Sequence, residues 1–410
     1  MRYLLSEHKK AIIFLASLLF ALSFILFLPR VFSDHYLGQV ESQKLKVENA
    51  EKVFVPSYIS TPTPVKGIYM TSWTASQTKL RDSLIKLIEN TELNTVVIDV
   101  KDYSGKIVFS INSPELKSFG SEEIRISDLP EFLDSLHKKG IYVIGRIAVF
   151  QDAYFVKHRP DLAVKNKVGV EIWKDYKGIS WVDPGSREYW NYIVLLAKEA
   201  RSVGFDEINF DYIRFPSDGN MQDISYLWSS TTSKDIVLKD FFKYLHEKLS
   251  DSGLKISADL FGMTTTAEND MGIGQVLENA LPYFDYISPM VYPSHYPPTF
   301  EGFNNPEDHP YEVVRSALES AVERANKLDL VMASSTPVVE NTAVPEQSSV
   351  HGITHYGARL RPWLQDFGLK MDYGPLEVRA QIKAVSDVGL VSWLLWSASN
   401  KYTKGALQDK

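Results

Sequence analysis

Acidic and amide side chains alternate with apolar ones in one short segment of the chain. Its five residues are Glu207, Ile208, Asn209, Phe210 and Asp211. In a β-strand, a period of two sends alternate side chains to opposite faces. The apolar pair must pack against surrounding helices, so the three polar side chains are expected to point into the interior of the sheet. Asp211 comes last, at the carboxyl end of the strand, where α/β enzymes keep their chemistry.

A second segment shows the same alternation and supplies another carboxylate. Between residues 256 and 261 the apolar side chains occupy the even positions, which leaves Ser257 and Asp259 on the interior face. If the two segments form neighbouring strands, Asp259 lies beside Asp211 near the same strand ends. Two carboxylates in unequal environments are what the cleavage of a glycosidic bond requires, one as proton donor and the other as nucleophile or base.

The surroundings of the two carboxylates assign them different catalytic roles. Asp211 is close in sequence to Arg214 and is expected near Arg146, so it is predicted to stay ionised as the nucleophile. Asp259 is followed by the apolar Phe261, so its pKa is predicted to be raised and the residue to act as general acid/base. Positions on adjacent strands suit a separation of about 5 Å, which favours a retaining mechanism.

Further charged residues are predicted to face the same interior. By parity, Asp99 and Lys101 point inward from the second apolar run and Arg146 from the third. Burying several charges at one place is costly, so such a cluster more often serves function than stability. The alternative is a structural salt-bridge network formed by Asp99, Lys101, Arg146, Glu207 and Arg361.

The seventh apolar run, residues 360–367, adds polar and aromatic side chains. Arg361, Trp363 and Gln365 share one face, and Asp366 falls on the other unless the strand ends before it. Aromatic rings at strand ends suit sugars, whose apolar C–H faces stack on indole and phenol rings. The predicted substrate-binding residues are Trp73, Asp99, Lys101, Arg146, Glu207, Asn209, Tyr212, Arg214, Tyr292, Trp363, Gln365, Asp366 and Trp396.

Short apolar runs alternate with amphipathic helical stretches from residue 67 onward, and together they must position these side chains. The expected strands are 67–70, 96–100, 141–149, 207–215, 256–261, 286–292, 360–367 and 390–397. Eight such units predict an α/β fold of the (β/α)8 TIM-barrel type over residues 66–405, with a doubly wound open sheet as the second choice. The long connections 151–185 and 328–358 are expected to be functional loops.

The N-terminal segment has a different character. Residues 11–28 are apolar, with basic residues before them and no small-residue cleavage signal after them. Residues 1–32 are therefore predicted to be a single-pass transmembrane signal anchor, and residues 33–65, which end in a Pro-rich stretch, a flexible linker. The barrel would then lie outside the cytoplasm at the cell membrane. The alternative is secretion after cleavage of the segment.

Composition argues against several other functions. The net charge is −7 at pH 7 with no concentrated basic region, so no nucleic-acid partner is expected. The chain has no cysteine, which excludes disulfides, thiolate metal sites and a cysteine nucleophile. Its nine histidines are scattered, and it lacks a Gly-x-Ser-x-Gly elbow or a Gly-rich phosphate loop. No metal and no cofactor are expected.

Several motifs occur in order and carry a family resemblance. They are Lys66-Gly67-Ile68-Tyr69, Val97-Ile98-Asp99-Val100-Lys101-Asp102, Gly204-Phe205-Asp206-Glu207, Asp211-Tyr212-Ile213-Arg214-Phe215-Pro216, Arg361-Pro362-Trp363-Leu364-Gln365-Asp366-Phe367 and Trp393-Leu394-Leu395-Trp396. Over residues 66–403 the chain resembles the bacterial putative glycosyl hydrolase domain family. The resemblance implies a TIM-barrel hydrolase fold akin to the alpha-amylase-like superfamily and a glycosidase role.

Better-understood barrels constrain the mechanism that the resemblance implies. The alpha-amylase family has a nucleophilic Asp at the end of its fourth strand, which Asp211 matches, and a Glu acid on its fifth, where this chain has Asp259. Chitinase-like barrels need a Glu two residues after the last Asp, and this chain has Ile213 there. The hypothesis is therefore a glycoside hydrolase for a cell-envelope or extracellular polysaccharide. The alternatives are a catalytically inactive carbohydrate-binding module of the cell envelope and a hydrolase or lyase acting on something other than a sugar.

Overall fold

A computed structural model describes residues 54–335 and 354–410. The predicted anchor 1–32 lies outside the described residues, as do most of the predicted linker and residues 336–353 of the second long connection. Residues Pro56–Lys410 form one compact unit. Within the described ranges, no helix is both long enough and apolar enough to span a bilayer.

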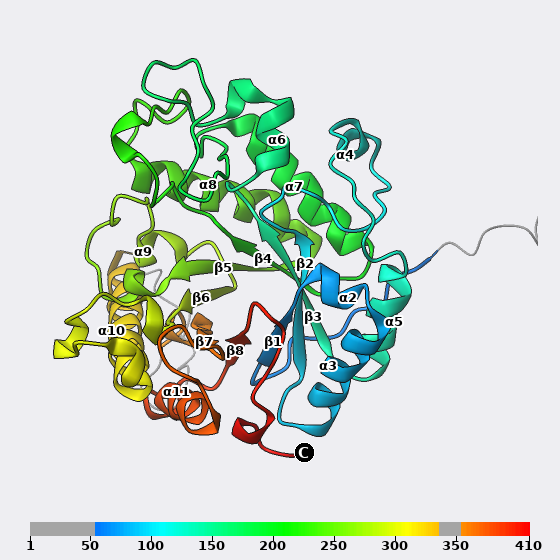
Figure 1. The fold of residues 1–410 in the computed structure, drawn as a ribbon, viewed down its shortest axis with the longest axis vertical. Helices are drawn as coiled ribbons and strands as arrows, with labels where there is room; N and C mark the ends of the chain where they lie inside the picture. The colour runs from blue at the N-terminus through cyan, green and yellow to red at the C-terminus, as the bar shows by residue number, and fades with distance from the viewer. Residues whose placement is uncertain (1–53, 336–353) are drawn as a thin grey trace, which may run out of the picture. The chain divides into compact units, whose positions relative to one another are not determined.

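Eight parallel strands close into a barrel, in which each strand pairs with the next and the last returns to the first (Figure 1). The predicted eight-stranded parallel barrel is thus confirmed, and the open sheet is excluded. The strands are β1 (Lys66–Met70), β2 (Thr95–Lys101), β3 (Tyr142–Ala148), β4 (Glu207–Asp211), β5 (Lys255–Phe261), β6 (Tyr286–Met290), β7 (Trp363–Gln365) and β8 (Trp393–Trp396).

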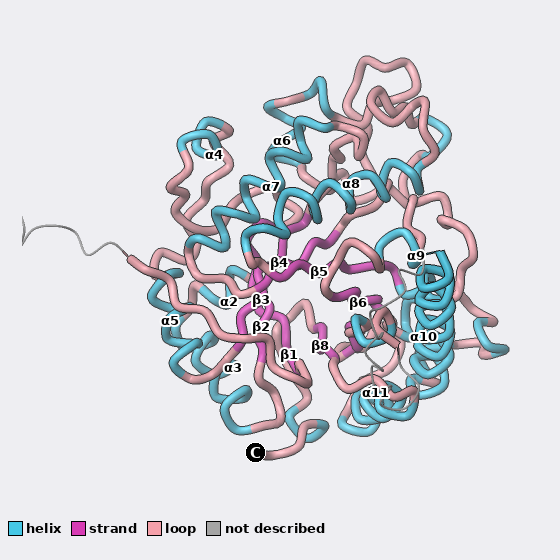
Figure 2. The backbone as a smooth tube through the Cα atoms, turned by 180° about the vertical axis from the view of Figure 1, so that it is seen from behind, coloured by secondary structure: helices cyan, strands magenta, loops and turns pink. Residues whose placement is uncertain are grey.

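Helices surround the strands on the outside of the barrel (Figure 2). The longer ones are α3 (Thr78–Asn90), α5 (Leu129–Lys138), α7 (Arg187–Ser202), α8 (Lys234–Leu249), α10 (Pro310–Ser335) and α11 (Pro375–Asp387). Short helices α2 (Ser72–Ala75), α4 (Pro114–Ser118), α6 (Ala153–His158) and α9 (Leu277–Ala280) lie in the connections. The prediction that the second long connection begins at residue 328 was wrong. Helix α10 continues to Ser335, because the stretch contains no Gly or Pro that would end it.

The strands bury side chains on both faces, which gives the barrel two apolar layers. Ile98 and Ile208 belong to the large cluster between strands and helices, whereas Val97, Ile144 and Leu394 belong to a small cluster inside the barrel. This division follows the period-two pattern of the sequence. The interior layer is small, so polar side chains fill the rest of the barrel.

Two local backbone features set where interior residues point. Strand β4 ends at Asp211 because Tyr212 adopts a positive φ of 52°, a left-handed conformation uncommon for a non-glycine residue. Strand β2 has a register shift between Asp99 and Lys101 in its pairing with β3. Such an irregularity inserts a residue and changes the parity beyond it, so Asp99 faces the interior whereas Lys101 does not.

Candidate active site

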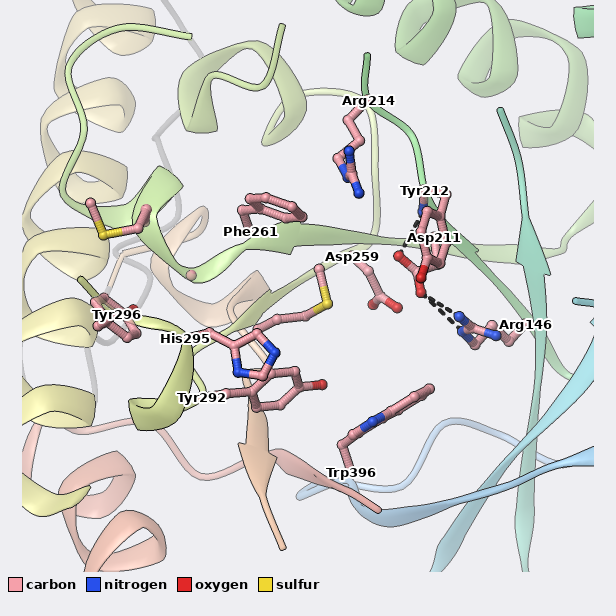
Figure 3. A pocket seen from close by; sticks show the side chains of 13 residues that line it. Arg146, Asp211, Tyr212, Arg214, Asp259, Phe261, Tyr292, His295, Tyr296 and Trp396 are labelled. Atoms are coloured by element: carbon pink, nitrogen blue, oxygen red, sulfur yellow. Dashed lines mark hydrogen bonds and ion pairs between the residues drawn. The ribbon is translucent and has the colours of Figure 1, made fainter. Parts of the chain in front are cut away.

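A cavity of about 330 Å³ opens at the carboxyl ends of the strands (Figure 3). Its walls combine two carboxylates and two arginines with many apolar and aromatic side chains. The lining residues are Arg146, Asp211, Tyr212, Arg214, Asp259, Phe261, Gly262, Met263, Met290, Tyr292, His295, Tyr296 and Trp396. This is the position and the composition expected of a binding site in a barrel enzyme.

Asp211 is held by three N–H hydrogen bonds at the end of β4. Arg146 donates from Nε at 3.1 Å and from Nη2 at 2.6 Å to Oδ2, and the backbone N–H of Tyr212 donates to Oδ1 at 2.6 Å. The left-handed turn at Tyr212 brings that N–H back onto the carboxylate. The negative charge of Asp211 is therefore compensated and its position is fixed.

Asp259 lies on β5 in the opposite kind of environment. Its side chain is buried, and no cation forms an ion pair with it among the described residues. Burial, reinforced by the negative charge of Asp211, raises its pKa from 3.8 to about 8. Asn209 and Trp363 both donate to Oδ1 at 2.8 Å, so Oδ2 is the oxygen that can carry the proton. At neutral pH this residue is a carboxylic acid.

The pairing of β4 with β5 sets the two carboxylates side by side. Asn209 pairs with Ser257 and Phe210 with Ala258, so the next positions in the same register are Asp211 and Asp259. Neighbouring strands are about 4.8 Å apart, and both side chains point into the cavity (Figure 3). The site therefore combines an ionised carboxylate with a protonated one at close range.

Behind Asp211, a network fixes the arginine that holds it. Nη1 of Arg146 donates to Asp99 at 2.8 Å, and Asp99 also accepts from the hydroxyl of Tyr69 at 2.7 Å. Tyr69 stacks on Trp396, with ring centres 4.1 Å apart. Burial raises the pKa of Asp99, against the opposing charge of Arg146. Asp99 thus supports the cavity from below rather than lining it.

Three predicted substrate-binding residues lie elsewhere and stabilise the fold. Lys101 turns outward at the register shift of β2 and pairs with Asp152 at 2.8 Å. Glu207 forms a fully buried ion pair with Arg361, which supports the structural-network alternative for these two residues. The side chain of Gln365 accepts from the N–H of Ser294 at 3.0 Å and donates to the carbonyl of Phe367 at 2.8 Å, which fixes the loops after β6 and β7.

Asp366 and Trp73 also lie outside the cavity lining. Strand β7 ends at Gln365, so Asp366 leaves the strand parity, and it accepts hydrogen bonds from the backbone and hydroxyl of Thr403 at 2.9 and 2.7 Å. Trp73 is 58% exposed on α2, with the guanidinium of Arg125 over its ring. Asn209 and Trp363, in contrast, contribute to the site indirectly, through their hydrogen bonds to Asp259.

Sequence reasoning missed part of the wall opposite Arg146. His295 and Tyr296 come from the connection after β6. Phe261 and Met290 are the last residues of β5 and β6, and Met263 lies in the short turn after β5. Burial lowers the pKa of His295. The two connection residues follow Pro293 in an irregular segment, where neither a period of two nor one of 3.6 gives a direction. Phe261 was expected beside Asp259 as an apolar neighbour, whereas nothing in the sequence pattern marks the apolar Met290 as part of a cavity wall.

A family model described as "Putative glycosyl hydrolase domain" matches residues 67–402. The chain belongs to this family. The match covers every strand from β2 to β8 and nearly all of β1, and so includes the whole cavity. No curated protein matches the chain.

Several solved structures are similar to this chain. The PgaB (BpsB) glycoside hydrolase domain from Bordetella bronchiseptica has a TM-score of 0.53 at 12% identity, over 82% of this chain and 94% of that one. At this identity the likeness shows the barrel fold alone. A hypothetical protein from Ruminiclostridium thermocellum is 33% identical over 47% of this chain and 96% of its own, with a TM-score of 0.43. The glycoside hydrolase domain of PelA from Pseudomonas aeruginosa is 11% identical over 83% and 97%, with a TM-score of 0.42.

Proposed function

We propose that the chain is a glycoside hydrolase that cleaves a polysaccharide with Asp211 and Asp259. The observation that carries this proposal is the contrast between the two carboxylates. One is charged and held by Arg146, and the other is buried with a pKa near 8, in neighbouring positions at one cavity wall. Membership of the family described as "Putative glycosyl hydrolase domain" and the barrel fold support the same conclusion.

Asp259 would act first as the general acid. Its proton passes from Oδ2 to the glycosidic oxygen as the bond between that oxygen and the anomeric carbon breaks. Asn209 and Trp363 hold Oδ1, which keeps the protonated oxygen turned to the substrate. These two residues position the acid and do not themselves touch the reacting atoms.

Asp211 would attack the anomeric carbon from the opposite face of the sugar. The short spacing of adjacent strands suits a retaining mechanism, in which a covalent glycosyl-Asp211 ester forms and is then hydrolysed. In the second step Asp259, now ionised, takes a proton from the attacking water, and the water oxygen bonds to the anomeric carbon as the ester bond breaks. Both side chains then return to their starting protonation states.

The aromatic walls of the cavity suit a sugar ring. Trp396 and Tyr292 line it from β8 and from the end of β6, and Phe261 faces them from β5 (Figure 3). Sugar rings bind between such faces, while nearby polar groups bond their hydroxyls. We propose a cell-envelope or extracellular polysaccharide as the substrate, because the apolar segment 11–28 would hold the barrel outside the cytoplasm.

The direct test is the release of reducing ends from a broad panel of polysaccharides by the full chain. We expect release from at least one glycan and a loss of at least about 10³-fold in kcat for Asp211→Asn, since the amide cannot attack as a carboxylate does. Asp240→Asn, which changes a half-exposed carboxylate on α8, is the matched control and should retain activity.

The outcomes of this panel separate the candidate functions. Retained turnover in a folded Asp211→Asn protein would contradict the assignment of the nucleophile. Binding of a glycan without any release by the wild type would favour the inactive carbohydrate-binding module. Product analysis by NMR then checks the stereochemistry, because the first product of a retaining enzyme has the same anomeric configuration as the substrate.

The pH dependence should show Asp259 titrating. Because only its protonated form can donate, kcat/KM is expected to fall as the pH rises through about 8 and to be nearly constant more than about one unit below that value. The measurement is a pH profile between 6 and 10 on a natural glycan and on an aryl glycoside with a very acidic leaving group. The activated substrate needs no proton, so its basic limb should be much weaker, and an equal limb for both substrates would rule out this role.

A further inference from the structure

Arg214 is a second cation in the cavity, and its surroundings differ from those of Arg146. All three guanidinium nitrogens of Arg146 donate to Asp99 or Asp211. Arg214 donates from Nη1 alone, to the carbonyl of Phe215 at 3.0 Å and to the hydroxyl of Ser217 at 3.1 Å. Neither acceptor carries a charge, and no carboxylate pairs with Arg214 among residues 54–335 and 354–410.

The free edge of this guanidinium faces the cavity. Nε and Nη2 of Arg214 have no hydrogen-bond partner in the described part of the chain. Neither atom is fully enclosed by protein atoms, whereas Nε of Arg361 is both enclosed and without a partner. The side chain is only 7% exposed and points toward the space above Asp211 and Asp259 (Figure 3). The two open donors can therefore be reached from within the cavity.

Aromatic rings enclose Arg214 on its other sides. Its guanidinium carbon lies 4.8 Å from the ring centre of Trp181, 4.6 Å from that of Phe261 and 5.4 Å from that of Tyr212. Cation–π contacts offset part of the lost hydration but supply no counter-charge. Burial lowers the pKa of Arg214 against the opposing negative charges of Asp211, Asp218 and Asp175, none of which forms an ion pair with it. A ligand that brings an oxyanion would supply the missing partner.

We propose that Arg214 binds an anionic group of the substrate, so that this cavity takes an acidic sugar. The group is a carboxylate, sulfate or phosphate, each of which can accept two parallel N–H bonds from the open edge of a guanidinium. Arg214 and Asp211 line the same cavity, so the acidic sugar is the one attacked or its immediate neighbour. This assignment rests on the proposed function in taking the ligand to be a sugar.

The test measures binding separately from turnover, in the full chain carrying Asp259→Asn. The probes are hexuronate oligosaccharides, their carboxyl-reduced neutral forms, and sulfated and phosphorylated neutral oligosaccharides. We expect an acidic form to bind about 10- to 100-fold more tightly than its neutral counterpart by calorimetry, as suits a charge-assisted bidentate contact. Which acidic form shows this preference identifies the anion.

Variants of Arg214 decide whether the preference belongs to that residue. Arg214→Gln should remove it and Arg214→Lys should keep part of it, because lysine retains the charge without the fork. Arg187→Gln removes an exposed arginine that lies over Trp190 on α7 and should change nothing. Equal binding of acidic and neutral forms, or an unchanged preference in a folded Arg214→Gln protein, would overturn the proposal.

This design separates failure of the inference from failure of the proposed function. If the wild type binds acidic sugars in preference to neutral ones through Arg214 but cleaves no glycan, the anion-binding role of Arg214 is supported and the hydrolase function is contradicted. Cleavage of neutral glycans, with kcat/KM unchanged by Arg214→Gln, would do the reverse. In an active enzyme, Arg214→Gln should raise KM more than it lowers kcat, since it contacts a substituent and not the breaking bond.

Discussion

Replacing Asp259 by Asn should remove turnover and at the same time stabilise the protein. The loss of the proton donor should lower kcat by about 10² to 10⁴-fold on unactivated glycans. The amide keeps the shape of the protonated acid, and its oxygen can still accept from Asn209 and Trp363. The variant therefore no longer has to take up a proton on folding, and it keeps the contacts of the wild type.

The stabilisation has a defined pH window. The pKa of Asp259 is raised in the folded state, so the stability that its protonated form contributes is fully present below about 3.8 and is lost as the pH rises through about 8. Asn does not titrate, so the difference in the free energy of unfolding should be near zero at pH 3.5 and on the order of 4 kcal/mol in favour of Asn at pH 7.

Urea denaturation at several pH values measures this difference directly. Asp240→Asn serves again as the control, because that carboxylate is half exposed and should give no such pH-dependent gain. A variant that is inactive but no more stable than the wild type at pH 7 would show that Asp259 is ionised in the resting protein. The general-acid role would then have to be given up.

Breaking the buried ion pair of Glu207 and Arg361 should lower the free energy of unfolding more than any other substitution proposed for this protein. Both side chains are fully buried, and Tyr142 also donates to Glu207 at 3.2 Å. Either Glu207→Met or Arg361→Met leaves one charge unpaired inside the barrel, so each is expected to cost about 3–5 kcal/mol. The double variant should recover most of this loss, because two apolar side chains leave no buried charge behind.

Urea denaturation of the two single variants and the double variant measures the coupling between the residues. Lys255→Met, which removes a half-exposed lysine paired with Asp285, is the control and should change stability little. Activity per folded molecule should be nearly unchanged in the double variant, since the pair does not line the cavity. A double variant as unstable as the sum of both single variants would mean that the two charges do not act as a pair.

Regular strands are what made the site partly predictable from the sequence. Alternation alone placed Asp211 and Asp259 inside the barrel, and burial explains why the pKa of Asp259 is raised as predicted. The same alternation failed for Lys101, because a one-residue register shift reverses parity and leaves no mark in the local sequence. It also could not place His295, since the direction of an irregular segment depends on contacts with distant residues.

The ion pair of Lys101 and Asp152 helps to hold the cavity wall in place before substrate binds. Asp152 also accepts from the hydroxyl of Tyr189 at 2.8 Å and caps the first turn of α6, so it ties the start of segment 151–185 to β2 and α7. Further along, Asp175 accepts from both Gln151 and Trp181, and Trp181 is the ring against Arg214. A wall anchored at both points is preorganised, so substrate should enter a finished site instead of assembling one.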